Sequence, residues 1–293
     1  MKSWRKPRQI LALLVLACLA AFLFFAELGA PLDTSEPALT SNVRFIPKII
    51  HQSWKTADVP KKHSDWVASW KIMNPGYEYI LWTDDDNRNL VATHYPWFLK
   101  TYDAFNDPIL RADASRLFYM HKYGGIYADL DFECLKPLDG LLKSHQAVIG
   151  SMTTGGDDAM RIHGVPNAWM ASRPGHPLWL RCARRVMRLD SKDKSVETRT
   201  GPVMLFWCLK DYRRKLWMIG GTFTDTLVLA DLLYPFSWLE TVSKEVENAC
   251  LAMRSETLNR TRCLNAVDPE RKAYAITYWG HSWTEPYYLD EQK

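Results

Sequence analysis

The stretch Gly124-Gly125-Ile126-Tyr127-Ala128-Asp129-Leu130-Asp131 decides the fold of this chain and carries its most informative chemistry. The Gly-Gly pair is typical of a helix end, and the run from Ile126 to Leu130 predicts a buried strand. In an extended backbone residues i and i+2 point to the same side, so Asp129 and Asp131 should present two carboxylates together. Because carboxylate oxygens suit Mn²⁺ and Mg²⁺, the sequence predicts a divalent-metal site at the strand end.

Strands and helices are expected to alternate on both sides of this stretch. The residue patterns predict strands at 46–53, 77–82, 126–130, 147–151 and 274–279. Helices are predicted around 66–73, after a cap at Thr83 or Asp84, and over 177–189 and 202–212. A further helix starts at Asp107-Pro108, with a capping carboxylate followed by proline, and ends at the glycine pair. This alternation predicts an α/β protein with a largely parallel sheet.

The N-terminal region predicts entry into the secretory pathway. Residues 10–26 form an uncharged apolar run long enough for a transmembrane anchor, with basic residues just before it and Glu27 just after it. The positive-inside rule then gives a cytoplasmic tail at 1–9, a stem at 27–44 and a lumenal domain at 45–293, in a single-pass type II arrangement. A cleaved signal peptide is the alternative, since small residues at 28–30 offer a cleavage point.

Charge and cysteine content narrow the function further. The net charge is +4, and four basic residues lie in the predicted tail, so the domain itself is neutral and lacks the surplus expected of a nucleic-acid-binding protein. Asn259-Arg260-Thr261 is an N-glycosylation triplet, and Cys250 and Cys263 on either side of it are able to close a disulfide. Cys18 lies in the apolar run, and the pairing of Cys134, Cys182 and Cys208 stays open, with buried thiols as the alternative.

Charged residues of the helix before the strand are candidates for substrate contacts. Arg111, Asp113 and Arg116 lie on this helix, and Asp113 and Arg116 are neighbours on its surface at i, i+3. An ordinary ion pair is one interpretation. Beside the acidic pair we favour another, in which Asp113 binds a ribose or sugar hydroxyl and Arg116 binds a donor-sugar or phosphate oxygen. Tyr127, within the strand, is assigned to the same donor site.

Aromatic and polar residues near both ends of the domain complete the predicted site. His281 is a candidate third metal ligand, Ser282 a candidate donor to a phosphate oxygen, and Trp283 a candidate cover for the leaving group. Trp54 follows the first predicted strand, where its ring is able to stack on a nucleobase. For any one histidine or tryptophan a role in the core or at the surface is the alternative.

Taken together, these blocks resemble the DXD-containing glycosyltransferases of family 32, and most closely their inositol phosphoceramide mannosyltransferase branch. The resembling segments are 46–54, 81–84, 111–116, 123–131, 167–170, 176–177, 200–202 and 282–283. The resemblance implies a GT-A-type, Rossmann-like fold, Mn²⁺ dependence, and retention of anomeric configuration. It also implies a nucleotide-sugar donor, with GDP-mannose favoured, and a lipid or glycan acceptor at the Golgi membrane. A separate membrane regulatory subunit is a further implied partner.

By the same resemblance Asp129 and Asp131 are the catalytic, metal- and diphosphate-binding pair. Asp113 and Arg116 match donor-sugar contacts, Trp54 the base-stacking position, and Ser282 and Trp283 the diphosphate contacts near the C-terminus.

Two other functions compete with glycosyl transfer. Haloacid-dehalogenase-type phosphatases also place an Asp-x-Asp after an apolar strand, and Asp157-Asp158 supplies an additional acidic pair. That family has Thr or Val two residues past the second aspartate, whereas this chain has Glu133. The other alternative is an inactive anchored subunit of a glycosyltransferase complex, which would have no need of two adjacent carboxylates.

Overall fold

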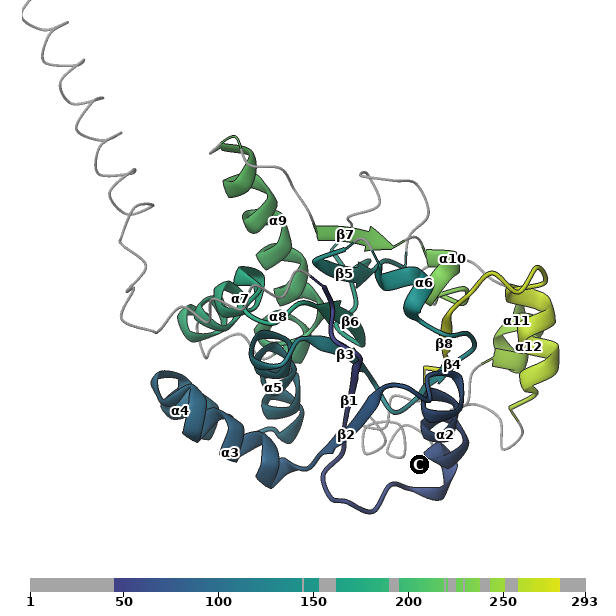
Figure 1. The fold of residues 1–293 in the computed structure, drawn as a ribbon, viewed down its shortest axis with the longest axis horizontal. Helices are drawn as coiled ribbons and strands as arrows, with labels where there is room; N and C mark the ends of the chain where they lie inside the picture. Colours follow the sequence, from purple (N-terminus) through teal and green to yellow (C-terminus); the bar gives the residue numbers. More distant parts are fainter. Residues whose placement is uncertain are drawn as a thin grey trace, which may run out of the picture. The chain divides into compact units, whose positions relative to one another are not determined.

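The computed structural model describes residues 45–143, 145–152, 162–189, 195–218, 220, 225–228, 230–237, 243–250 and 258–279. A six-stranded sheet in the order β2-β1-β3-β6-β5-β7 runs through this part of the chain (Figure 1). Its strands are β1 (Ile49–Ser53), β2 (Glu78–Trp82), β3 (Gly125–Ala128), β5 (Ala147–Gly150), β6 (Trp169–Ser172) and β7 (Asp225–Val228). The expected α/β class is confirmed.

The sheet is mixed rather than wholly parallel. β1 pairs in parallel with β2 and β3, and β5 pairs in parallel with β7, as the alternation of helices and strands predicts. β6 lies between β3 and β5 and runs antiparallel to both. The expectation of a largely parallel sheet therefore holds for five of the six strands in the described part and fails for β6.

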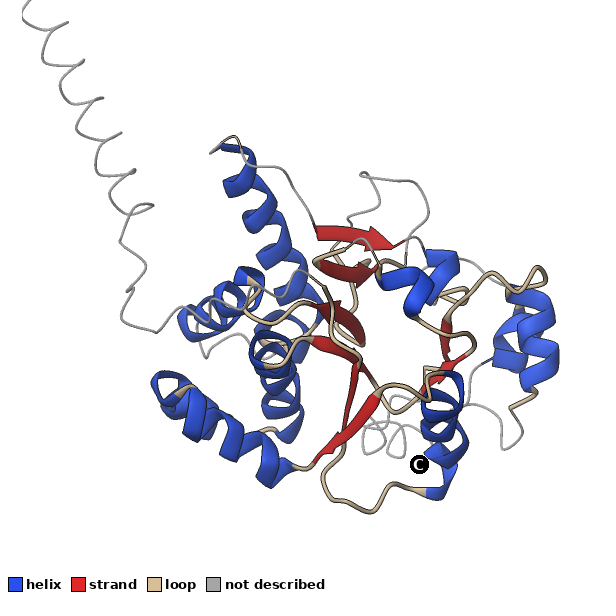
Figure 2. Cartoon of the chain, in the orientation of Figure 1, coloured by secondary structure: helices blue, strands red, loops and turns tan. Residues whose placement is uncertain are grey.

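Helices cover one face of the sheet, on the left in Figure 2. They are α3 (Asp84–His94), α4 (Pro96–Asp103), α5 (Pro108–Lys122), α7 (Pro177–Arg188), α8 (Val196–Arg199) and α9 (Pro202–Met218). Their apolar sides bury one core cluster that includes Phe98, Phe118 and Trp179. A disulfide between Cys182 and Cys208 joins α7 to α9, a pairing that the sequence left open.

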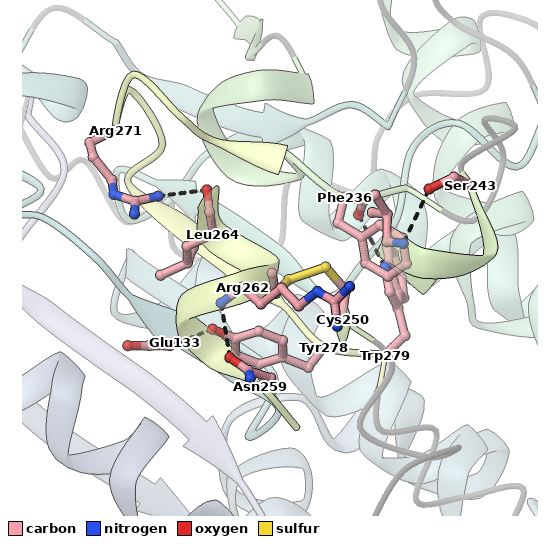
Figure 3. Close-up of a disulfide and its surroundings, with 12 residues drawn as sticks. Glu133, Phe236, Ser243, Cys250, Asn259, Arg262, Leu264, Arg271, Tyr278 and Trp279 are labelled. Carbon is pink, nitrogen blue, oxygen red and sulfur yellow. Dashed lines mark hydrogen bonds between the residues drawn. A yellow bond between two sulfur atoms is a disulfide. The ribbon is translucent and has the colours of Figure 1, made fainter. Parts of the chain in front are cut away.

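The other face carries a second core cluster and a small second sheet. Its elements are η1 (Lys61–His63), α2 (Ser64–Met73), β4 (Phe132–Cys134), α6 (Asp139–Leu142), α10 (Ala230–Leu233), α11 (Lys244–Cys250), α12 (Arg260–Val267) and β8 (Ala275–Thr277). β4 and β8 pair antiparallel in the two-stranded sheet. The predicted Cys250–Cys263 disulfide joins α11 to α12 and is confirmed (Figure 3), while Cys134 is a buried thiol.

The helix α5 begins and ends as its sequence predicts. An Asp107 carboxylate oxygen accepts a hydrogen bond from the Ile109 N–H at 3.1 Å, and Pro108 occupies the first turn. At the other end Gly124 and Gly125 have φ values of 65° and 89°. A Cβ atom on Gly125 would lie 2.5 Å from the Ile49 carbonyl oxygen, so only glycine lets β3 start beside β1.

Several predicted boundaries need correction. The strand expected at 126–130 ends at Ala128, and the late strand spans only Ala275–Thr277 and belongs to the second sheet. The helix expected at 202–212 continues to Met218. The predicted anchor at residues 10–26 lies outside the described residues. Among the helices that are described, none has the length and hydropathy of a membrane span.

Candidate active site

Asp129 and Asp131 lie in a turn between the two sheets. The chain leaves the large sheet after Ala128 and enters the small sheet at Phe132. The Phe132 N–H donates to the Asp129 carbonyl oxygen at 3.1 Å, which closes the turn. The prediction of an extended Asp-x-Asp was therefore wrong, because a backbone that changes sheets has to bend. The two side chains nevertheless border the same cavity.

The backbone of this turn is fixed on both sides. The Asp129 N–H donates to the Ala168 carbonyl oxygen at 2.9 Å. The Gln52 side-chain amide donates to the Asp129 carbonyl oxygen at 3.1 Å, and the Tyr79 hydroxyl donates to the Gln52 side-chain oxygen at 2.8 Å. Gln52 was not among the predicted site residues. Its signal in the sequence is a polar side chain at a buried position of β1.

The cavity beside the turn has a volume of about 420 Å³ and gathers every described residue that was assigned a role in the metal or donor site, whereas Arg111 does not line it. These residues are Trp54, Asp113, Arg116, Tyr127, Asp129 and Asp131. Apolar side chains, including Ile109, Met152 and Val196, form another part of its wall. A larger hollow of about 720 Å³ lies beside α11 and α12, but none of the predicted site residues lines it.

Four of these side chains form what we call the cavity network: Asp113, Arg116, Tyr127 and Asp129. The Arg116 guanidinium lies 3.0 Å from an Asp113 oxygen and 3.3 Å from an Asp129 oxygen. The Tyr127 hydroxyl donates to the same Asp129 oxygen at 2.6 Å. The guanidinium also lies over the Tyr127 ring, 4.5 Å from its centroid. The i, i+3 ion pair is therefore real, but it extends to the predicted metal-binding turn.

Burial and charge act against each other in this network. Burial raises the pKa of Asp113, and the nearby Arg116 opposes the rise. For Arg116 burial alone would lower the pKa, but Asp129, Tyr127 and Asp113 reverse the effect and the pKa is raised. Burial likewise raises the pKa of Tyr127 well above its usual value. Arg116 thus stays charged and Tyr127 stays protonated as a hydrogen-bond donor.

The residues present fit part of a divalent-metal site. Two carboxylates on one turn beside a cavity supply the hard oxygen ligands that Mn²⁺ or Mg²⁺ prefers. The contacts of Tyr127 and Arg116 with the Asp129 side chain fall on the same oxygen, Oδ1. No cluster of three or more His, Cys, Asp and Glu side chains occurs within the described residues. The remaining ligands would come from the substrate's phosphates or from His281, which lies outside the described residues together with Ser282 and Trp283.

Trp54 follows β1 and lies at the wall of the cavity. The backbone N–H of Trp54 donates to the Trp82 carbonyl oxygen at 3.0 Å, so Trp54 continues the pairing of β1 with β2. Its ring packs edge-on against His63, with the centroids 5.8 Å apart. Both side chains line the cavity. Stacking of Trp54 on a nucleobase stays a prediction, and this position at the cavity wall is compatible with it.

Comparison with known proteins finds relatives that share this region of the chain. Residues 60–148 match the family described as "Glycosyltransferase sugar-binding region containing DXD motif". The chain is 44% identical over 146 residues to inositol phosphoceramide mannosyltransferase 3 of Schizosaccharomyces pombe, which covers 49% of this chain and 38% of that protein. The predicted resemblance to the DXD glycosyltransferases is confirmed.

Two further relatives carry similar names. Inositol phosphoceramide mannosyltransferase 2 of Schizosaccharomyces pombe is 37% identical over 199 residues, covering 66% of this chain and 54% of the relative. Mannosyl phosphorylinositol ceramide synthase SUR1 of Saccharomyces cerevisiae is 36% identical over 175 residues, covering 58% and 44%. The chain spans about half the length of the curated relatives it matches.

The matched DXD region holds five of the six cavity-lining candidates, and Trp54 precedes it. Two more residues from outside the matched region belong to the site, although neither was predicted to have a role there. The Thr200 hydroxyl donates to Asp113 at 3.2 Å, and the Asn167 carbonyl oxygen accepts from Arg116 at 2.9 Å. Both lie in segments that resemble the DXD glycosyltransferases of family 32, which was the available signal.

Proposed function

We propose that this chain is a metal-dependent, retaining hexosyltransferase with a GT-A-type fold. The observation that carries the proposal is the turn that brings Asp129 and Asp131 to one cavity, together with the Arg116 side chain and the Trp54 ring. Family membership of residues 60–148 supports transfer over phosphatase chemistry. A divalent ion held by the two aspartates would neutralise negative charge on a departing diphosphate.

The proposed reaction transfers mannose from GDP-mannose to an inositol phosphoceramide-like lipid, in keeping with the names of the relatives. The acceptor hydroxyl oxygen bonds to the anomeric carbon of the sugar as the bond from that carbon to the diphosphate oxygen breaks. The hydroxyl proton passes to the released diphosphate. Attack and departure occur on the same face of the sugar, so the anomeric configuration is retained.

The chain's own residues prepare this step by holding the acidic pair in place. Arg116 contacts both Asp113 and Asp129 and offsets their negative charges, which holds the two carboxylates close together beside the cavity. Tyr127 fixes one oxygen of Asp129 and thereby its orientation. Trp54 is proposed to stack on the base, and the apolar wall near Ile109 and Val196 to exclude water.

We further propose that the reaction takes place at the Golgi membrane, with the domain on the lumenal side. The two disulfides support this location, since disulfides form and persist in oxidising compartments. The exposed Asn259 of the glycosylation triplet caps α12 by accepting from the Arg262 N–H at 2.9 Å. Its amide nitrogen is on the opposite branch of the side chain, so a glycan there is compatible with the cap.

The test uses the full chain in detergent with Mn²⁺, labelled GDP-mannose and an inositol phosphoceramide acceptor. Asp131→Asn should lower transfer and donor hydrolysis by about 10³-fold, an effect typical of removing a preorganised charge at the reacting group. The melting temperature should change little. Glu133→Gln is the matched control, because this neighbouring carboxylate is buried outside the cavity and should leave the metal dependence intact.

Three outcomes would contradict the proposal. Activity that persists in EDTA would contradict the proposed metal dependence. Release of phosphate from simple phosphomonoesters would favour the dehalogenase-type alternative. Absence of activity with all nucleotide sugars, from a chain that melts normally, would favour the inactive-subunit alternative.

A further inference from the structure

The helices α7 and α9 concentrate positive charge, with four of their basic residues exposed and four half-buried. α7 carries Arg181, Arg184, Arg185 and Arg188 and no acidic residue, and α9 carries Lys210, Arg213, Arg214 and Lys215 against Asp211 alone. Eight basic residues against one acidic residue give these two helices a net charge of +7. The whole chain carries +4, so all its other residues together carry −3. The near-neutral net charge of the domain therefore conceals a strongly basic surface.

Both helices contribute to the same surface. The Cys182–Cys208 disulfide fixes them against each other, and Arg185 of α7 lies 2.9 Å from the Asp211 carboxylate of α9. Figure 1 shows the two helices as neighbours on the helical face of the sheet. Burial lowers the pKa of Arg181, and the positive charges of Arg184 and Arg188 lower it further, against Tyr212 and Asp211. The arginines are thus close enough to repel one another.

Apolar side chains stand beside these cations. Trp217 is 81% exposed and Met218 55% exposed at the end of α9, and Met187 on α7 is 42% exposed. The Trp217 indole is therefore not part of the core, and it follows the basic residues Arg214 and Lys215 in the same helix. Basic residues interleaved with exposed Trp and Met are the composition of surfaces that lie in the headgroup region of a bilayer.

We propose that the α7–α9 surface docks onto an anionic membrane, with the basic side chains on lipid phosphates and Trp217 among the headgroups. This goes beyond the proposed glycosyl transfer, although the two agree, since a phosphate-bearing lipid acceptor makes its own membrane anionic. A nucleic acid is the other polyanion that matches the charge. The exposed methionines favour the bilayer, because they add apolar area rather than stacking surface.

The experiment reconstitutes the full chain into vesicles of phosphatidylcholine alone or with 30 mol% of an anionic phospholipid. The chain carries Trp217→Cys with an environment-sensitive label, in a Cys18→Ser background. The anionic vesicles should shift the label's emission to the blue, and the zwitterionic vesicles should not. The triple variant Arg184→Gln, Arg188→Gln, Lys215→Gln should abolish the shift, with roughly fivefold weaker surface binding for each charge removed.

The matched control is Lys71→Gln, Lys143→Gln, Lys244→Gln, which removes three exposed charges from α2, the end of α6 and α11. It should leave the shift unchanged. Donor hydrolysis in detergent should be unchanged in both triple variants, so failure of the docking proposal is separable from failure of the proposed function. Equal shifts in both kinds of vesicle, or a larger shift with heparin or single-stranded DNA than with anionic vesicles, would overturn the proposal.

Discussion

Two arginine–carboxylate–tyrosine networks lie on either side of the Asp129–Phe132 turn, and they are built in opposite ways. In the cavity network the Arg116 side chain is buried, at 6% exposure, and the Asp129 side chain is 32% exposed. In the second network, which we call the lobe network, Glu133 bonds Arg260 and Tyr278 and is the buried partner. Glu133 is 8% exposed and Arg260 is 53% exposed. Figure 3 shows Glu133 and Tyr278 beside the Cys250–Cys263 disulfide.

The difference teaches which carboxylate is able to take a ligand. One oxygen of Glu133 accepts from Arg260 at 2.6 Å and the other accepts from the Tyr278 hydroxyl at 2.6 Å. Asp129 instead receives Tyr127 and Arg116 on a single oxygen and faces the cavity. A buried cation that supports an accessible carboxylate prepares a binding site, whereas an accessible cation that covers a buried carboxylate closes a structural contact.

The largest expected effect separates the two arginines. Arg116→Met should reduce the free energy of unfolding by about 3–5 kcal/mol, because it leaves Asp113 buried without its cation. Arg260→Met should cost about 1–2 kcal/mol, since the guanidinium is more than half exposed and Tyr278 still satisfies Glu133. Urea unfolding of both variants measures the difference. Equal losses would erase the contrast between the networks.

An intermediate effect of pH extends the comparison to two buried imidazoles, His51 of β1, which packs against Tyr119 of α5, and His121 of α5. Burial lowers the pKa of His51 and of His121 to about 4. His51 donates to the Gly124 carbonyl oxygen at 2.9 Å and accepts from the Trp82 indole at 3.0 Å, a geometry that only the neutral ring satisfies. A lowered histidine pKa does not reduce the free energy of unfolding above pH 6.5. The reduction develops as the pH falls from 6.5 toward 4, because the unfolded chain binds the proton more readily.

Each histidine should therefore remove on the order of 2–3 kcal/mol of stability by pH 4. Hydrogen exchange at pH 7 and pH 4.5 would measure it, with faster exchange expected first in β1 and α5. Loss of protection in α12 before α5 would contradict the assignment of the acid-sensitive groups.

The smallest expected effect compares the two tyrosines. Tyr278→Phe should cost about 1 kcal/mol by removing one bond to Glu133, and it should leave the Mn²⁺ concentration for half-maximal activity unchanged. Tyr127→Phe should raise that concentration roughly tenfold, since it removes the hydrogen bond that orients Asp129, the proposed metal ligand. Titration of activity with Mn²⁺ decides between them. A shift in Tyr278→Phe would mean that the lobe network also positions the metal.

Local signals predicted most of the elements around the site. The Asp107-Pro108 start of α5, the glycine pair at its end and the Thr83 cap of α3 depend on neighbouring residues only, and each is present in the structure. The change of sheet after Ala128 depends on β8, almost 150 residues further along the chain, so the bend between Asp129 and Asp131 had no local signal.

The same distinction explains the missed site residues. Gln52, Asn167 and Thr200 contact the cavity network through hydrogen bonds to Asp129, Arg116 and Asp113 that span 77, 51 and 87 positions of sequence. The polarity and local spacing of residues do not predict hydrogen bonds between positions so far apart in the sequence. The Cys182–Cys208 pair was open for the same reason, whereas Cys250 and Cys263 are only 13 residues apart and were paired correctly.

The position of the acidic turn has one more consequence, for the choice of ion. Two carboxylates on a single strand would keep a separation fixed by the pleat. Here one aspartate follows a strand of the large sheet and the other precedes a strand of the small one, so their spacing changes when the small sheet shifts. In the proposed metal site, the rigidity of the small sheet formed by β4 and β8 would therefore govern how strictly cations of different radius are distinguished.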